Sequence, residues 1–327
     1  MAQDVGKKET ELEQKLHFAL PIARFFVPLQ AMKWEMAITY LCIFLLVGLM
    51  MALLPTHEWM VWEPAVVIPI CALLFTLLVY LSAQLAGTGK GVVEVACTAL
   101  FVLFFLPGAD NFFARDEEAM LELSSQCIVP FFITQYQRVS QRDYRHVYAL
   151  MLLMGIFCSY THDGITLPLC GSFLWLAFVN RDTFFKTACW PMVIGFLIGT
   201  AFSIWHHLHT GQSDMPDGLQ GMLSRTGETL LLLWNTKVFL LSVALTSYLS
   251  VNRWGRRLLA KKFHEHTLLC CCAMLSFCVL PFAPLGIDNA VTGVCFFCMY
   301  WALILVNSLS QPFFNRTGRP QKEETTL

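Results

Sequence analysis

Apolar and polar segments alternate along most of this chain, and ten of the apolar segments are long. A helix needs about 20 residues to cross roughly 30 Å of hydrocarbon, and most of these segments approach that length. The pattern predicts an all-α, polytopic integral membrane protein with about ten transmembrane helices and at least eight. The predicted spans are residues 36–54, 64–85, 91–107, 119–136, 145–160, 165–179, 187–205, 230–250, 267–285 and 290–309.

Three of the ten predicted spans carry weaker signals. Segment 119–136 contains Pro130 and several polar residues, among them Glu122 and Gln126. Segments 145–160 and 165–179 are short, and only a four-residue turn separates them. These two segments are interpreted either as tilted spans or as a re-entrant helical hairpin.

Composition supports the membrane interpretation and sets the domain boundaries. Hydrophobic residues make up 56% of the chain and charged residues only 14%, against about 25% charged in a typical soluble domain. Residues 1–34 are predicted to form a cytoplasmic amphipathic segment, broken at Pro21 and Pro28. Residues 35–310 are expected to form the transmembrane helical domain, and residues 311–327 a cytoplasmic tail. The first apolar run is too long for a cleavable signal peptide.

The positive charges fall almost entirely on one side of the predicted spans. One set of alternating gaps contains 19 of the 22 Lys and Arg residues, and the exceptions are Arg115, Arg225 and Lys237. The positive-inside rule therefore predicts a polytopic inner-membrane protein with both termini in the cytoplasm. The cytoplasmic loops are too short for a nucleotide-binding domain, and the chain has no P-loop and no dinucleotide fingerprint.

Most of the 13 cysteines lie within apolar segments, where they are interpreted as small packing residues. Cys295 and Cys298 form a CxxC pair inside a span, without a second pair. No cofactor is therefore expected, and a divalent cation is the one exception considered. Its weak candidate ligands are Asp116 and Glu117 in an acidic outer loop, or His206 and His209 at the end of a span. The alternative to metal binding is that these residues form an ordinary solvated surface.

Lys237 is the most informative single residue. A span that began after it would contain only residues 238–250, about 20 Å of helix, which is too short to cross. Lys237 is therefore predicted to lie about two turns below the outer surface, next to Asn235. Such a lysine usually faces a bundle interior or a watery cavity. The alternative is that it snorkels to the outer headgroups.

Two further positions on the predicted outer side have candidate chemistry. Asp163, assisted by His162, is a candidate general base or cation ligand between two spans, and the alternative role is an ordinary helix cap. Arg225 closes the predicted outer loop 206–229 and is a candidate receptor for a phosphate or diphosphate. Pairing with Glu228 is the equally plausible alternative for Arg225.

Several short motifs between residues 145 and 310 occur in the order found in a known family. They are His162-Asp163-Gly164 leading to Pro168, Gly195 and Gly199 in one span, Leu223-Ser-Arg225, and Pro284-Leu-Gly-Ile-Asp288-Asn289. In this order the chain resembles a bacterial multipass family that is itself similar to the GT-C class of membrane glycosyltransferases. The resemblance implies an extracytoplasmic transferase that uses a polyprenyl-phosphate-linked sugar donor in envelope polysaccharide synthesis.

In that scheme Asp163 and Arg225 line the cavity, and Arg225 or Lys237 meets the carrier phosphate. The first outer loop, residues 55–63, departs from the GT-C pattern, because the loop is short and its only acidic residues are Glu58 and Glu63. The alternatives are a non-catalytic membrane subunit of an envelope assembly system and a transporter or flippase for an anionic or amphipathic solute. The expected partners are membrane lipid, a polyprenyl-phosphate carrier and other membrane proteins, and not nucleic acid.

Overall fold

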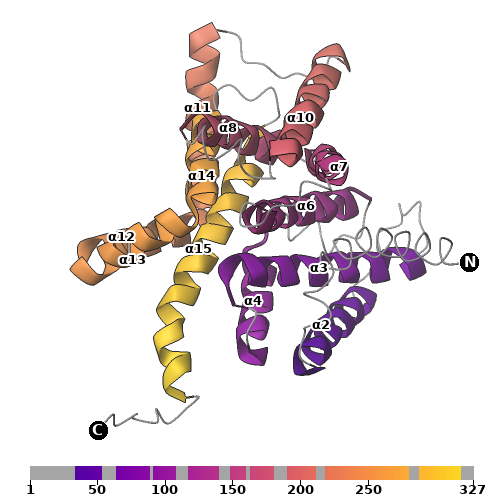
Figure 1. The fold of residues 1–327 in the computed structure, drawn as a ribbon, viewed down its shortest axis with the longest axis vertical. Coiled ribbons are helices and arrows are strands. Elements are labelled where there is room, and N and C mark those ends of the chain that lie inside the picture. Colours follow the sequence, from indigo (N-terminus) through magenta and orange to yellow (C-terminus); the bar gives the residue numbers. More distant parts are fainter. Residues whose placement is uncertain are drawn as a thin grey trace, which may run out of the picture.

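The computed structural model describes residues 34–53, 64–88, 91–107, 117–139, 148–159, 163–179, 190–210, 218–279 and 287–317. Every element in these ranges is a helix (Figure 1). In chain order they are α2 (Trp34–Leu53), α3 (Pro64–Ala86), α4 (Val92–Phe105), α6 (Glu117–Val139), α7 (Tyr148–Ser159), α8 (Asp163–Val179), α10 (Trp190–Thr210), α11 (Gly218–Asn235), α12 (Lys237–Val251), α13 (Arg253–Glu265), α14 (Thr267–Val279) and α15 (Ile287–Thr317). The amphipathic segment predicted for residues 1–34 lies almost wholly outside the described residues.

The all-helical prediction is confirmed, and each predicted span coincides with a helix or a helix pair. Within the described ranges, α2, α3 and α15 are long and apolar enough to cross a membrane, and the bent pair α11–α12 makes a fourth if it is counted as one broken span. The apolar helices in α4, α8, α10 and α14 are shorter. The total of about ten spans and the side of each terminus therefore stay predictions.

Two predictions about the third quarter of the chain are wrong. Segment 230–250 is not one continuous span, because α11 and α12 meet there at an angle of 80°. The predicted outer loop 206–229 is helical at both ends. Its first residues, up to Thr210, belong to α10, and its residues from Gly218 onward belong to α11. Hydropathy does not predict the first half of α11, because that half of the helix is polar and its mean hydropathy is low.

Helix α15 forms the centre of the molecule and appears in yellow in Figure 1. It has 31 residues, a length of about 46 Å, and it contacts α3, α4, α8, α11, α12 and α14. The apolar stretch of α15 is 78% buried, whereas that of α2 is 22% buried. The interior of the fold is therefore built around the most C-terminal of the described helices.

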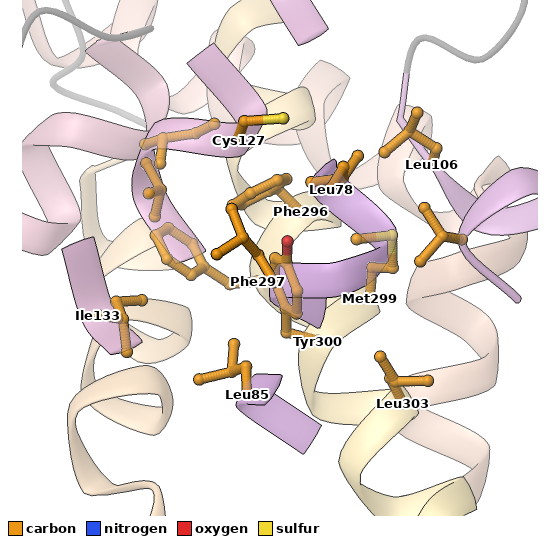
Figure 2. Packing of buried hydrophobic residues seen from close by; sticks show 14 of the residues in the cluster. Leu78, Leu85, Leu106, Cys127, Ile133, Phe296, Phe297, Met299, Tyr300 and Leu303 are labelled. Carbon is orange, nitrogen blue, oxygen red and sulfur yellow. The ribbon is translucent and has the colours of Figure 1, made fainter. Parts of the chain in front are cut away.

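Aromatic and aliphatic side chains of α15 pack against α3 in the main hydrophobic core. Figure 2 shows Phe296, Phe297 and Tyr300 close to Leu78 and Leu85. Phe296 and Tyr300 stack edge to face, with ring centroids 4.9 Å apart. Offset and edge-to-face pairs of this kind add to the free energy gained by burying the rings.

Polar side chains fix the position of α15 within this apolar core. The Ser82 hydroxyl donates to the Tyr300 hydroxyl at 3.4 Å, and the Asn307 amide donates to the carbonyl oxygen of Ala86 at 2.8 Å. The second bond satisfies a carbonyl group at the C-terminal end of α3 that has no partner within its own helix. Hydrogen bonds between apolar helices fix their relative position along the helix axes.

Glycines allow α7 and α10 to pack with their backbones in contact. A Cβ atom on Gly195 would overlap the carbonyl oxygen of Leu152, and one on Gly155 would overlap that of Met192. A Cβ atom on Gly199, one turn beyond Gly195, would overlap the Ser159 hydroxyl oxygen of α7. The spacing of Gly195 and Gly199 is the small-residue spacing that brings membrane helices together.

The outer faces of the helices are apolar, while several polar side chains are buried. Phe178 is 81% exposed and Phe104 is 72% exposed, whereas Gln126 and Gln135 on α6 are almost completely buried. The polar residues that weakened the prediction for segment 119–136 therefore include side chains directed to the interior. Extensive apolar exposure of this kind is typical of a surface that contacts lipid or another protein.

His266, at the junction of α13 and α14, makes the fold sensitive to pH. Its Nδ1 atom is buried without a hydrogen-bond partner among the described residues. Burial, assisted by the nearby Lys262, lowers the pKa of the imidazole. Below about pH 6.5, the His266 imidazole is therefore protonated in the unfolded chain but resists protonation in the folded chain. The contribution of His266 to stability is present above that pH and is lost on acidification.

We expect the melting temperature of the detergent-solubilised protein to fall between pH 7.5 and 5.5, and His266→Gln to reduce that fall. His264→Gln, which changes an exposed histidine two residues earlier, is the matched control and should keep the wild-type pH dependence. An unchanged pH dependence in His266→Gln would contradict the assignment.

Candidate functional site

The predicted site residues are divided between described and undescribed parts of the chain. Glu58, Asp116 and His162 lie outside the described residues. Asp163 is the first residue of α8, and Glu117 is the first residue of α6. The side chains of Arg225, Asn235 and Lys237 are all described, and they supply the geometry of the site.

The beginning of α8 packs against the beginning of α15. A Cβ atom on Gly293 would overlap the carbonyl oxygen of Gly164, so the two backbones are in contact there. Asp163 precedes Gly164 and therefore lies beside the first turns of α15. This contact explains why a glycine occupies position 293.

Arg225 lies on the buried face of α11. Its side chain is 7% exposed, and Thr229 and Leu233 continue the same buried face at four-residue intervals. Among the described helices, α15 and α12 make the most extensive contacts with α11. Glu228 is exposed and accepts a hydrogen bond from the Ser224 hydroxyl at 3.3 Å.

The opposite face of α11 is apolar and exposed, with Leu223, Leu231 and Trp234 each 66% exposed. A helix with an arginine inside and leucines outside has the reverse of the soluble pattern. An ionisable residue on the interior side of an apolar helix usually marks a functional site or a fixed structural pair.

Thr236 forms the break between α11 and α12. Its φ and ψ angles of −86° and 127° are extended, and its backbone N–H donates to the carbonyl oxygen of Leu233 at 3.0 Å. Its hydroxyl donates to the same carbonyl at 2.7 Å and accepts from the Cys295 thiol at 3.5 Å. Asn and Thr are common where a helix is interrupted, because their side chains compete with the backbone for hydrogen bonds.

The break exposes Asn235 and Lys237, one on each side of Thr236. Lys237 begins α12, where the N-terminal partial positive charge of the helix makes a cation unfavourable and an anion favourable. Among the described residues, the Lys237 ammonium makes no hydrogen bond and no ion pair. Two hydrogen-bond donors, the Asn235 amide and the Lys237 ammonium, therefore lie at the N-terminus of α12, next to apolar surface residues.

Arg225 and Lys237 do not share one binding position. Ten residues of helix lie between Arg225 and Thr236, and the two positions are about 16 Å apart along the axis of α11. The Arg225 side chain is buried, whereas the Lys237 side chain is exposed. Arg225 lies on the buried face of α11, and Lys237 lies at the break.

Helix α15 also separates Asp163 from the break. Gly293 contacts the beginning of α8, and Cys295 contacts Thr236. Two residues correspond to about 200° around a helix, so these contacts lie on nearly opposite sides of α15. The described part of the chain therefore does not place Asp163 and Lys237 at one site.

Of the four candidate metal ligands, only His209 has a described side chain, and this side chain has local partners. His209 is exposed, its ring lies 4.5 Å from that of Trp205, and its Nδ1 atom is 2.9 Å from the Trp205 carbonyl oxygen. Within the described ranges, no three His, Cys, Asp or Glu side chains are grouped closely enough to hold a metal ion.

Comparison of the chain with protein-family models, with curated proteins and with solved structures gives no match. The likeness to GT-C glycosyltransferases therefore stays a prediction from the sequence motifs.

Proposed function

We propose that this chain is a polytopic protein of the bacterial inner membrane that binds the phosphate of a polyprenyl-phosphate-linked sugar at the α11–α12 break. In this proposal it is a GT-C-like glycosyltransferase, or a relative of one, that acts on the extracytoplasmic side. The observation that carries the proposal is the exposure of Asn235 and Lys237 at a break between two apolar helices.

The chemistry of this position suits an amphipathic anion. The Lys237 ammonium and the N-terminus of α12 attract a phosphate, and the Asn235 amide supplies a further hydrogen-bond donor. The exposed Leu231 and Trp234 on α11 and Leu240 on α12 offer apolar surface to an isoprenoid chain. A lipid-linked phosphate satisfies both kinds of surface, whereas a small soluble anion would use only the first.

The lateral position of the break favours a lipid-linked ligand over a solute to be transported. A transporter needs a path to both faces of the membrane, and discontinuous helices in transporters usually meet at an interior site. Asn235 and Lys237 are exposed on the outer surface of the helix bundle.

The position of α15 favours a second candidate function, that of a non-catalytic subunit that holds the carrier lipid. A transferase needs an acid close to the carrier phosphate to activate the acceptor hydroxyl. Asp163 lies across α15 from Lys237, as described above. The transferase proposal therefore requires a different acid, and the remaining candidates from the sequence are Glu58 and the acidic residues 116–118.

Replacement of Lys237 tests the binding site directly. We expect Lys237→Met to weaken retention of polyprenyl phosphate about 10- to 100-fold, because a hydrogen bond to a charged group is lost. Native mass spectrometry of protein extracted with its own lipids measures this retention. Lys262→Met is the matched control, because the Lys262 ammonium already bonds to Glu265 at 2.8 Å on α13. Equal retention by wild type and Lys237→Met would contradict the proposal.

A transfer assay on the purified chain separates the two candidate functions. Sugar transfer from a synthetic polyprenyl-phosphate donor by the chain alone identifies an enzyme. Retention of the carrier without transfer identifies a subunit that acts with a partner, and the search then moves to membrane proteins that co-purify.

A further inference from the structure

Helix α13 is a polar, basic helix between two apolar helices. It follows α12 at Asn252, whose φ and ψ angles of −92° and 142° are extended, and α14 begins two residues after it ends. The helical structure of α13 arranges the charges on one face.

The inner face of α13 packs against the end of α12. A Cβ atom on Gly255 would overlap the carbonyl oxygen of Leu249, so the two backbones meet there. Leu258 and Leu259 are half-buried on the same side. The orientation of α13 about its own axis is therefore fixed by packing.

The outer face of α13 has exposed arginines. Arg253 and Arg257 are four residues apart and share one face of the helix, and Arg256 is exposed beside them. Among the described residues these three side chains form no ion pair, whereas Lys261 and Lys262 both pair with Glu265. Three guanidinium groups are thus available to an external anion.

Two exposed aromatic side chains lie on the two flanks of this arginine face. Trp254 is 58% exposed and Phe263 is 45% exposed, and their positions are about 180° apart around the helix. Aromatic rings beside basic residues are typical of helices that lie in the headgroup region of a membrane. Exposed Tyr248 on α12 lies less than two turns away.

We propose that the arginine face of α13, formed by Arg253, Arg256 and Arg257, binds anionic phospholipid headgroups at the membrane surface. The charge complementarity is direct, because guanidinium groups form paired hydrogen bonds with phosphate oxygens. The distribution of positive charge along the chain predicts that this surface is the cytoplasmic leaflet, where anionic lipids attract basic segments. The inference does not depend on the carrier site at the α11–α12 break.

The test uses the full-length protein in micelles that contain equal amounts of phosphatidylglycerol and phosphatidylcholine. Native mass spectrometry gives the ratio of the two bound lipids. We expect wild type to prefer phosphatidylglycerol and the triple variant Arg253→Gln, Arg256→Gln, Arg257→Gln to lose most of that preference. Each arginine is expected to contribute about fivefold to the association of the anionic lipid.

The triple variant with lysine at the same three positions is the matched control. Gln, Lys and Arg have similar helix propensities, so both triple variants should retain α13. The lysine variant should keep the preference, because it keeps the charge, and 0.5 M NaCl should weaken it in wild type. An unchanged preference in the glutamine variant would overturn the proposal. Equal binding of the two lipids by wild type would also overturn it and would indicate a soluble anionic partner.

Discussion

Replacement of Gly195 by leucine is expected to separate α7 from α10 and to destabilise the protein by about 3 kcal/mol. The new side chain would have to occupy the space of the Leu152 carbonyl group. A backbone carbonyl cannot rotate away as a flexible side chain can, so the two helices must move apart. Thermal unfolding in detergent should show a decrease in melting temperature of about 10 °C.

Gly227 on α11 offers a control with the same chemistry. A Cβ atom there would meet nothing within 4 Å, although the residue also lies within a helix. Gly227→Leu should leave the melting temperature unchanged or raise it, because leucine has the higher helix propensity by up to about 1 kcal/mol. A Gly195→Leu protein as stable as Gly227→Leu would show that α7 and α10 do not pack through their glycines.

Replacement of Arg225 by glutamine is the second change with a large expected effect. Arg225 is 7% exposed, and a buried guanidinium group is retained in a fold only where surrounding groups compensate for its lost hydration. Shortening the side chain and removing its charge leaves those groups without compensation. We expect a loss of about 3 kcal/mol, measured as a lower melting temperature in detergent.

Arg257→Gln makes the same chemical change at an exposed position of α13 and should alter stability by less than about 0.5 kcal/mol. Arg225→Lys keeps the charge but not the planar group, so an intermediate result is expected. If Arg225→Gln were as stable as wild type but no longer retained polyprenyl phosphate, Arg225 would be a ligand-binding residue instead of a structural one.

The positions of the helices could be predicted because hydropathy and charge define them directly. Apolar runs of membrane length end where Lys, Arg, Gly or Pro residues begin, and the helices observed in the described ranges follow those runs closely. Hydropathy averaged over a segment cannot locate a bend, however. The bend at Thr236 has a local signal, because Asn235, Thr236 and Lys237 are three consecutive polar residues between two leucine-rich runs.

The composition of the site was harder to predict than the fold. The sequence places Asp163, Arg225 and Lys237 near the outer side of their segments, but it contains no information on how each helix faces α15. Arg225 proves to be buried and Lys237 exposed, although Arg225 was predicted in an outer loop and Lys237 within a span. Which face of a helix is buried depends on its neighbours, and those neighbours are distant in the sequence.

The helical structure of α13 also has a signal that a count of charges misses. Arg253, Arg257 and Lys261 recur at four-residue intervals, which is the spacing of one helix face. The positive-inside rule uses only the number of cations in a segment. The spacing of those cations indicates which of them lie together.

The central position of α15 also affects how the protein is assembled during synthesis. Helices α3, α8 and α12 leave the ribosome before the helix against which they pack, so their inner faces have no protein partner at first. Lipid must occupy that space and then be displaced when α15 enters the membrane. Tyr300 and Asn307 carry polar groups into that layer and reach their partners on α3 only in the assembled state. Biogenesis of this protein is therefore expected to include a docking step in which α15 displaces lipid from the inner faces of these helices.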